Sequence, residues 1–201
     1  MASDAVTLIM NDHRMLEDLF EQVQSGKGDR RALVEEIAAR LMAHAQAEEK
    51  KVYPALTKAD PSEKDEVHHG YEEHDEAEQL LKKAQQNIDS PQFEQMFTEF
   101  VNAVKHHVEE EESEILPALR DAVDKAKLEQ LGQAFTELRL DELRKAGFDA
   151  ETEHAAAYAR GRSDLTDATR DELYEMAKDA DISGRSSMSK TELSKALRQQ
   201  S

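Results

Sequence analysis

The chain has 201 residues, of which 38% are hydrophobic and 35% are charged, and its formal net charge is −18. This charge argues against nonspecific binding to nucleic acid or to anionic membranes. The sequence contains no cysteine, which excludes disulfides and thiolate ligands, so any bound metal must be held by nitrogen and oxygen atoms.

Residues 1–10 have neither the basic segment nor the apolar run of a signal peptide, and no stretch of 18 apolar residues occurs in the sequence. We therefore expect a cytoplasmic protein. Glycine and proline are few and separate long blocks of helical periodicity, and no alternating strand pattern stands out. The sequence predicts an all-α fold.

Four long amphipathic helices are predicted at residues 4–24, 29–53, 61–87 and 91–116. The second and the fourth are expected to end at Pro54 and Pro117, because the residue before a proline is pushed out of the α region. We expect an irregularity in the third helix at Gly70. The apolar stripe of the fourth helix consists of Phe93, Phe97, Phe100, Val104 and His107.

The pattern weakens after residue 117. Residues 125–138 predict one more amphipathic helix, an alanine-rich segment follows to about residue 160, and residues 161–164 are a plausible linker. The apolar side of that helix carries Leu128, Leu131, Phe135 and Leu138. Two short helices around a turn are predicted in the C-terminal part. The expected domains are residues 1–140, a helical extension and linker at 141–164, and a small helical module at 165–201.

The sequence contains a duplicated unit, in which a lone histidine on one helix is followed by His-x-x-x-Glu on the next. The His-x-x-x-Glu segments lie 63 residues apart and the lone histidines 61 residues apart. A spacing of four places the His and the Glu on one helix face, about one turn from each other. The first copy contains His13, His44 and Glu48, and the second contains His74, His107 and Glu111.

These six side chains predict a metal site. A single histidine in an apolar stripe is more often a hydrogen-bonded core residue, but here four histidines recur with two glutamates. Burying imidazoles and carboxylates together is costly unless a cation compensates. The set has too many ligands for one tetrahedral zinc and too much nitrogen for calcium or magnesium. It suits a dinuclear iron centre, with manganese as the weaker alternative.

The doubled His…His-x-x-x-Glu arrangement resembles the hemerythrin family, in its HHE cation-binding branch, over about residues 4–140. Ferritin-like di-iron bundles use Glu-x-x-His instead. The resemblance implies an up-down four-helix bundle with one or two extra helices, holding a non-haem di-iron site with an oxygen bridge. It assigns His13, His44 and Glu48 to one half of the site and His74, His107 and Glu111 to the other.

One position departs from the oxygen-carrying members of that family, which have a fifth histidine where this chain has Gly70. Tyr71, on the same helix face as His74, and Tyr53 are candidates for an additional oxygen ligand. The ordinary alternative is that each tyrosine packs with its hydroxyl satisfied. The missing histidine predicts rapid autoxidation and some peroxide turnover in place of reversible oxygen carriage.

Neighbouring polar residues receive no ligand role. Glu49 and Glu112 lie about 100° round the helix from the ligands, so we expect them to face solvent or to contact a ligand from outside. The remaining histidines point away from the predicted set or lack a companion at ligand spacing. They are His68, His69, His106 and His154.

Residues 165–198 resemble the small helical modules of the Rho-terminator N-terminal or SAP-like type, on residues 172–178, 184–186, 188–190 and 192–193 together with Ile182. Such modules often bind nucleic acid. Residues 161–201 contain seven Lys/Arg and eight Asp/Glu, so nucleic-acid binding is expected to be weak, and a protein-interaction or structural role is the alternative.

The family resemblance implies a protein that binds or turns over O₂, NO or H₂O₂. The enzymatic activities that it suggests are weak peroxide consumption of the catalase type or an NO-related reaction. The alternative is an iron- or oxygen-responsive regulatory or stress protein, whose C-terminal module contacts a partner or nucleic acid. Passive metal storage is disfavoured, because one two-metal site per chain stores little metal.

Overall fold

The computed structural model describes residues 4–148 and nine single positions between residues 177 and 196. The chain divides into two compact units, residues 2–148 and residues 149–201 with Met1. His154, the predicted linker and most of the predicted C-terminal module lie outside the described residues.

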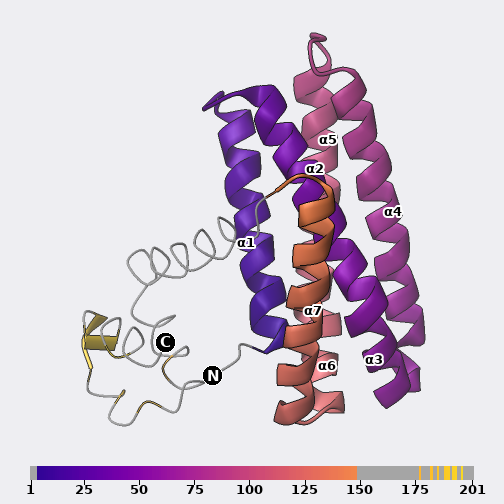
Figure 1. Cartoon of the computed structure of the whole chain (residues 1–201), viewed down its shortest axis with the longest axis vertical. Coiled ribbons are helices and arrows are strands. Elements are labelled where there is room, and N and C mark those ends of the chain that lie inside the picture. The colour runs from indigo at the N-terminus through magenta and orange to yellow at the C-terminus, as the bar shows by residue number, and fades with distance from the viewer. Residues whose placement is uncertain are drawn as a thin grey trace. The chain divides into compact units, whose positions relative to one another are not determined.

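The described residues form helices and no strand, which confirms the all-α prediction. Four long helices make an up-and-down bundle, α1 (Ala5–Gln24), α2 (Arg30–Ala47), α4 (Lys64–Gln86) and α5 (Phe93–Glu110). The further helices are α3 (Tyr53–Ala59), α6 (Leu116–Ala122) and α7 (Lys125–Lys145). Figure 1 shows α7 lying along the bundle beside α1, and it packs against both α1 and α2.

Aspartates fix the starts of three helices. Asp4, Asp29 and Asp124 each accept a hydrogen bond from the main-chain N–H three residues later, a cap that contributes about 1 kcal/mol. The fourth long helix begins differently from the prediction. Pro91 lies in the turn before α5, and the helix begins at Phe93.

The predicted apolar stripes form two core clusters, which are separated by a polar layer. Along α1, Ala5 and Ile9 belong to one cluster, Leu16 and Phe20 belong to the other, and His13 lies between them. Phe20 packs edge-on against two phenylalanines of α5, with ring centroids 5.3 and 6.2 Å apart. The buried histidines thus lie between two well-packed apolar layers.

The helices do not end at the two prolines as predicted. The chain passes from α2 through a π-turn, η1 (Glu48–Val52), and continues as α3 with Pro54 in its first turn. The N–H of Tyr53 donates to the carbonyl of Glu48, five residues back. The second copy does the same through η3 (Glu111–Ile115). A proline ring clashes with the carbonyl four residues back in an α-helix, and the wider π-turn relieves that clash.

The helix α4 is unbroken at Gly70, contrary to the predicted irregularity. Gly70 is buried, and a Cβ built there would lie 3.1 Å from the hydroxyl oxygen of Tyr53 and 3.3 Å from its Cε2. The glycine therefore makes room for the tyrosine ring.

The helix α7 extends past the predicted end at residue 138, so the predicted domain boundary at residue 140 falls inside it. Leu128, Leu131 and Phe135 are buried as predicted. Leu138 is half-buried, and the neighbouring Arg139 is buried instead. In the part of the chain that the structure describes, no helix combines the length and apolar character needed to cross a membrane.

Candidate metal centre

The structure brings the six predicted ligands together in the polar layer between the two core clusters. Glu48 and Glu111 are completely buried, and none of the four histidines is more than 8% exposed. The ligand atoms form two overlapping groups, and within each group they lie within 4.8 Å of one another. One group is His13, His44, Glu48 and Glu111, and the other is Glu48, His74 and His107.

Both carboxylates lie between the two halves of the site. The Nε2 atom of His44 is 3.2 Å from Glu48 Oε1, and that of His74 is 3.5 Å from Glu48 Oε2. Glu111 Oε2 is 3.1 Å from Nε2 of His13 and 4.0 Å from Nε2 of His107. Glu111 therefore lies closer to the first half, although the family resemblance assigns it to the second. Glu48 has contacts in both.

Each of the four histidines is also held from outside, because its Nδ1 atom faces a second carboxylate. The distances are 2.8 Å from His13 to Glu112, 3.4 Å from His44 to Asp12, 2.9 Å from His74 to Glu49 and 2.9 Å from His107 to Glu73. An outer carboxylate on the second ring nitrogen is the usual partner of a metal-binding histidine, because it fixes the tautomer and the ring orientation.

The outer carboxylates follow the duplication in the sequence. Glu49 and Glu112 each follow a predicted ligand by one residue, and the structure places them as outside contacts of a ligand, one of the two expected positions. Asp12 and Glu73 each precede a predicted histidine by one residue and were not identified from the sequence. Their 61-residue spacing, equal to that of the histidines they precede, is the signal that could have revealed them.

The buried atoms of the site fit a cation. Inward-facing atoms without a hydrogen-bond partner are Nε2 of His13, Nε2 of His44, both oxygens of Glu48 and Oε2 of Glu111. An unsatisfied buried polar atom costs about 1–3 kcal/mol, and more if it is charged, so such a concentration needs a compensating group. Imidazole nitrogens and carboxylate oxygens together, with no thiolate, suit iron or manganese.

The two central carboxylates differ in their affinity for a proton. Burial and the nearby carboxylate of Glu111 raise the pKa of Glu48 well above its usual range. Burial also opposes ionisation of Glu111, but the neighbouring imidazoles, among them His13 with its Nε2 atom 3.1 Å away, together outweigh burial and hold the pKa of Glu111 well below its usual range. Without a cation, a proton bound by this pair is therefore held on Glu48 and not on Glu111.

The two histidines of the first half also differ. Burial lowers the pKa of His44 to about 4. For His13, the Glu111 carboxylate beside Nε2 and the hydrogen bond between Nδ1 and Glu112 together outweigh burial and raise the pKa to about 9. A proton on His13, beside the Glu111 carboxylate, thus supplies part of the positive charge that a metal would bring.

Tyr53 lies inside the site. It is fully buried, its hydroxyl donates to Glu111 Oε1 over 3.0 Å, and its ring stacks on His74 with centroids 5.8 Å apart. Burial and the Glu111 carboxylate raise the pKa of this phenol well above its usual value. The corresponding residue of the second copy, 63 positions later, is Leu116, so the two halves differ here.

Tyr71 has a different environment. Its hydroxyl donates to the main-chain carbonyl of Glu49 over 3.0 Å, and its ring packs edge-on against Tyr53 with centroids 5.4 Å apart. These contacts match the alternative of a packed tyrosine with a satisfied hydroxyl.

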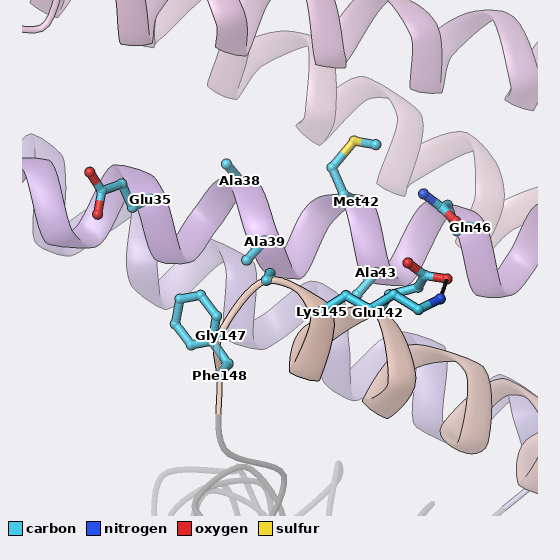
Figure 2. Close-up of a pocket in the computed structure, with 11 residues that line it drawn as sticks. Glu35, Ala38, Ala39, Met42, Ala43, Gln46, Glu142, Lys145, Gly147 and Phe148 are labelled. Atoms are coloured by element: carbon cyan, nitrogen blue, oxygen red, sulfur yellow. Dashed lines mark hydrogen bonds and ion pairs between the residues drawn. The ribbon is translucent and has the colours of Figure 1, made fainter.

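A surface pocket of about 750 Å³ lies apart from this cluster, between α2 and the end of α7 (Figure 2). Its lining includes Ala39, Met42 and Ala43 of α2 together with Gly147 and Phe148. None of the six predicted ligands lines it, so the metal centre is a buried layer of the bundle and not part of this pocket.

Comparison with known proteins gives one match. The family model described as hemerythrin HHE cation binding domain matches residues 4–119, which is more than half of the chain. No curated protein and no solved structure matches. The matched region includes all six predicted ligands and ends before α7.

Proposed function

Because this chain belongs to the hemerythrin HHE cation-binding family, we propose that it is a non-haem di-iron protein that binds or turns over O₂, NO or H₂O₂. The family and the buried His/Glu clusters show a cation-binding domain; iron, two ions per chain and the small ligand are the proposal. The observation that supports it best is the layer of inward-facing, unpaired nitrogen and oxygen atoms.

The donor set and its symmetry support two ions. Glu48 has one oxygen near His44 and the other near His74, which is the position of a bridging carboxylate. When bound, an iron pair would supply one-electron and two-electron redox chemistry at these ligands. The outer carboxylates keep a proton on each Nδ1 atom, so the lone pair of each Nε2 atom is directed inward.

The protein can also supply a proton at this site. The hydroxyl of Tyr53 lies in the space that Gly70 leaves, and it donates to Glu111 Oε1. Peroxide turnover needs proton transfer, and Tyr53 Oη and Glu111 Oε1 are placed to hold and pass one proton. Phe135 covers His44 from the α7 side, with ring centroids 5.8 Å apart, and helps to exclude water. These contacts favour turnover over reversible carriage.

Anaerobic titration with Fe²⁺, followed by exposure to O₂, NO and H₂O₂ and monitored by absorption, tests this function. We expect two Fe²⁺ per chain and a spectral change with at least one of the three ligands. One zinc per chain after anaerobic iron loading, or no response to any ligand, would contradict the proposal. A reversible, long-lived oxygenated spectrum would leave the di-iron site standing and refute the preference for turnover.

The regulatory alternative has one observation in its favour. Without a cation, the unpaired atoms of Glu48 and Glu111 lie where α2 and α5 pass into their π-turns, so metal occupancy would alter the order of both helices. Steady-state peroxide consumption separates the two functions. Sustained turnover identifies an enzyme, whereas a single stoichiometric oxidation favours a sensor.

A further inference from the structure

A second cluster of imidazoles and carboxylates lies on the surface between α4 and α5, and none of its members belongs to the six central residues. His69 and Glu73 are four residues apart on α4, and His106 and Glu110 are four residues apart on α5. Each helix therefore presents a His-x-x-x-Glu pair on one face, the same spacing that the buried centre uses. The expectation that His106 lacks a companion at ligand spacing is thus wrong, because Glu110 is that companion. The two pairs face each other across neighbouring helices.

The distances among these side chains are short. The Nε2 atom of His69 is 3.4 Å from Glu110 and 3.8 Å from Glu73. The Nε2 atom of His106 is 3.3 Å from Glu110 and 4.0 Å from Glu73. Ligand atoms of a tetrahedral site with bonds of about 2.0–2.1 Å lie roughly 3.3 Å apart. His69, Glu73 and Glu110 each offer one ligand atom within 4.8 Å of the other two, so small side-chain movements would close a three-residue site, and a larger movement of His106 would complete it.

Glu73 distinguishes this cluster from an ordinary charged surface. Its side chain is only 10% exposed, and its Oε2 atom faces Nδ1 of His107 at 2.9 Å. Its other oxygen, Oε1, is buried and has no hydrogen-bond partner. The Nε2 atoms of His69 and His106 lie closer to this unpaired oxygen than to the other oxygen of Glu73. A buried carboxylate oxygen thus points into the cluster without a cation.

The other half of the bundle shows how such a carboxylate is balanced. Asp12 is the counterpart of Glu73, and there Arg139 of α7 donates to the same oxygen that faces His44. The first copy has Leu8, Ala43 and Ala47 at the positions that correspond to the other three members of the cluster. One half therefore has an arginine and no surface ligands, whereas the other has two imidazoles and a second carboxylate around the unpaired oxygen.

We propose that His69, Glu73, His106 and Glu110 form a second binding site, separate from the buried centre, for a divalent first-row transition-metal cation such as Zn²⁺. Two imidazole nitrogens and two carboxylate oxygens are a sufficient set for four-coordinate zinc. The cation would balance Glu73 as Arg139 balances Asp12. The exposure of the two histidines, 51% and 63%, leaves the site open to solvent.

The test is a calorimetric titration of the full-length, iron-loaded protein with Zn²⁺, at a pH where free imidazole is neutral. We expect one further equivalent of zinc to bind to the unmodified protein and this equivalent to be lost in the double variant His69→Ala/His106→Ala. His68→Ala is the matched control, because His68 is 73% exposed on the same helix and contacts Glu72 instead. That variant should keep the extra equivalent.

Failure of this site and failure of the buried centre are distinguishable. Iron content before the zinc titration reports on the buried centre, whereas the difference of one zinc equivalent between unmodified protein and double variant reports on the surface site. Equal zinc binding by both proteins, or an equal loss in His68→Ala, would overturn the proposal and leave ordinary ion pairs. Circular dichroism of each variant verifies that the helices are retained.

Discussion

Each of the four buried histidines is positioned by two carboxylates, one at each ring nitrogen. For His107, Nδ1 faces Glu73 at 2.9 Å, and Nε2 is directed toward the interior, 3.0 Å from Nε2 of His74. The Nδ1 atoms of both rings face carboxylates. When each Nδ1 atom holds the proton, the two Nε2 atoms direct their lone pairs to one point. The outer carboxylate, here Glu73, therefore controls both the ring orientation and the basicity of the histidine that it contacts.

Replacing His107 with alanine should lower the iron content of the protein by up to one ion per chain. The change removes one inward-facing nitrogen and the contact between Nδ1 of His107 and Glu73. Metal analysis after anaerobic loading is the measurement. His68→Ala provides the matched control, because this exposed histidine lies outside the centre. If the two variants lost equal amounts of iron, the assignment of the helix face would be incorrect.

Gly70→Ala should destabilise the protein by up to about 2 kcal/mol, because the cost of overpacking, roughly 1–3 kcal/mol, exceeds the gain in helix propensity. Alanine is favoured over glycine in a helix by about 1 kcal/mol, but the new Cβ would lie 3.1 Å from the hydroxyl of Tyr53. That ring is packed between His74 and Tyr71 and cannot shift freely. Denaturant unfolding measures the change in the free energy of unfolding.

The control for Gly70→Ala is the same change in a Tyr53→Phe background. Removing the hydroxyl deletes the closest atom, so the cost of the added Cβ should become smaller. An unchanged cost in the two backgrounds would show that the tyrosine hydroxyl does not explain the glycine.

At the level of elements, the sequence predicted the helices and the six polar side chains that lie together in the bundle, but not the contacts that depend on pairing between helices. The stripe from Phe93 to His107 follows directly from helical periodicity, and all of it is buried. The π-turns were missed because local rules end a helix before a proline, whereas here Glu48 and Glu111 begin a wider turn that continues it. The partner of His44 is Asp12, on another helix, and sequence spacing within one helix cannot reveal such a pair.

The contribution of α7 was also hidden in the sequence. Arg139 interrupts an apolar stripe, so it reads as a solvent-exposed residue, yet it is buried and donates to Asp12. The family match ends at residue 119. A helix outside the matched region therefore supplies the cation that balances one outer carboxylate of the site.

Arg139→Ala should cost about 3–5 kcal/mol of stability, because removing one partner of a buried ion pair leaves the other uncompensated. The charge of Arg139 and the hydrogen bond with His44 together outweigh burial and keep the pKa of Asp12 below its usual value. Without the arginine, Asp12 should gain a proton more easily and hold His44 less firmly. Arg144→Ala is the control, because its ion pair with Asp141 is exposed. Thermal melts of both variants measure the loss of stability. If Arg139→Ala lost no more stability than Arg144→Ala, Arg139 would not be the residue that balances Asp12.

At the scale of the whole molecule, the bundle carries a layer of imidazoles and carboxylates between two apolar clusters. The apolar clusters stabilise the fold. In the metal-free polar layer, protons on His13 and Glu48 reduce the charge imbalance that a cation would otherwise balance. The stability of the metal-free protein should therefore depend on pH, and that of the loaded protein much less, since a metal bound to these atoms displaces the protons.

Between pH 6.5 and 9, the direction of the pH dependence is set by the histidines and glutamates of the site that change protonation. His13 has a pKa raised from 6.5 to about 9, so its stabilising contribution is complete below 6.5 and is lost as the pH rises through 9. Glu48, whose pKa is raised by burial, is already ionised in the unfolded chain and adds a loss in the same direction. Burial lowers the pKa values of His44 and His74, so both are neutral in the folded protein. In the unfolded chain they lose their remaining charge just above pH 6.5, which adds only a small gain of stability in the opposite direction.

We therefore expect the metal-free protein to lose on the order of 1–3 kcal/mol of stability between pH 6.5 and 9, while the iron-loaded protein changes little. The difference between the two melting temperatures should widen as the pH rises across this window. Calorimetric melts of both forms over that range measure it, with His13→Gln as a comparison, because removing the imidazole should flatten much of the metal-free curve. A difference that stays constant or narrows with rising pH would show that protons and metal do not compete for the same buried atoms.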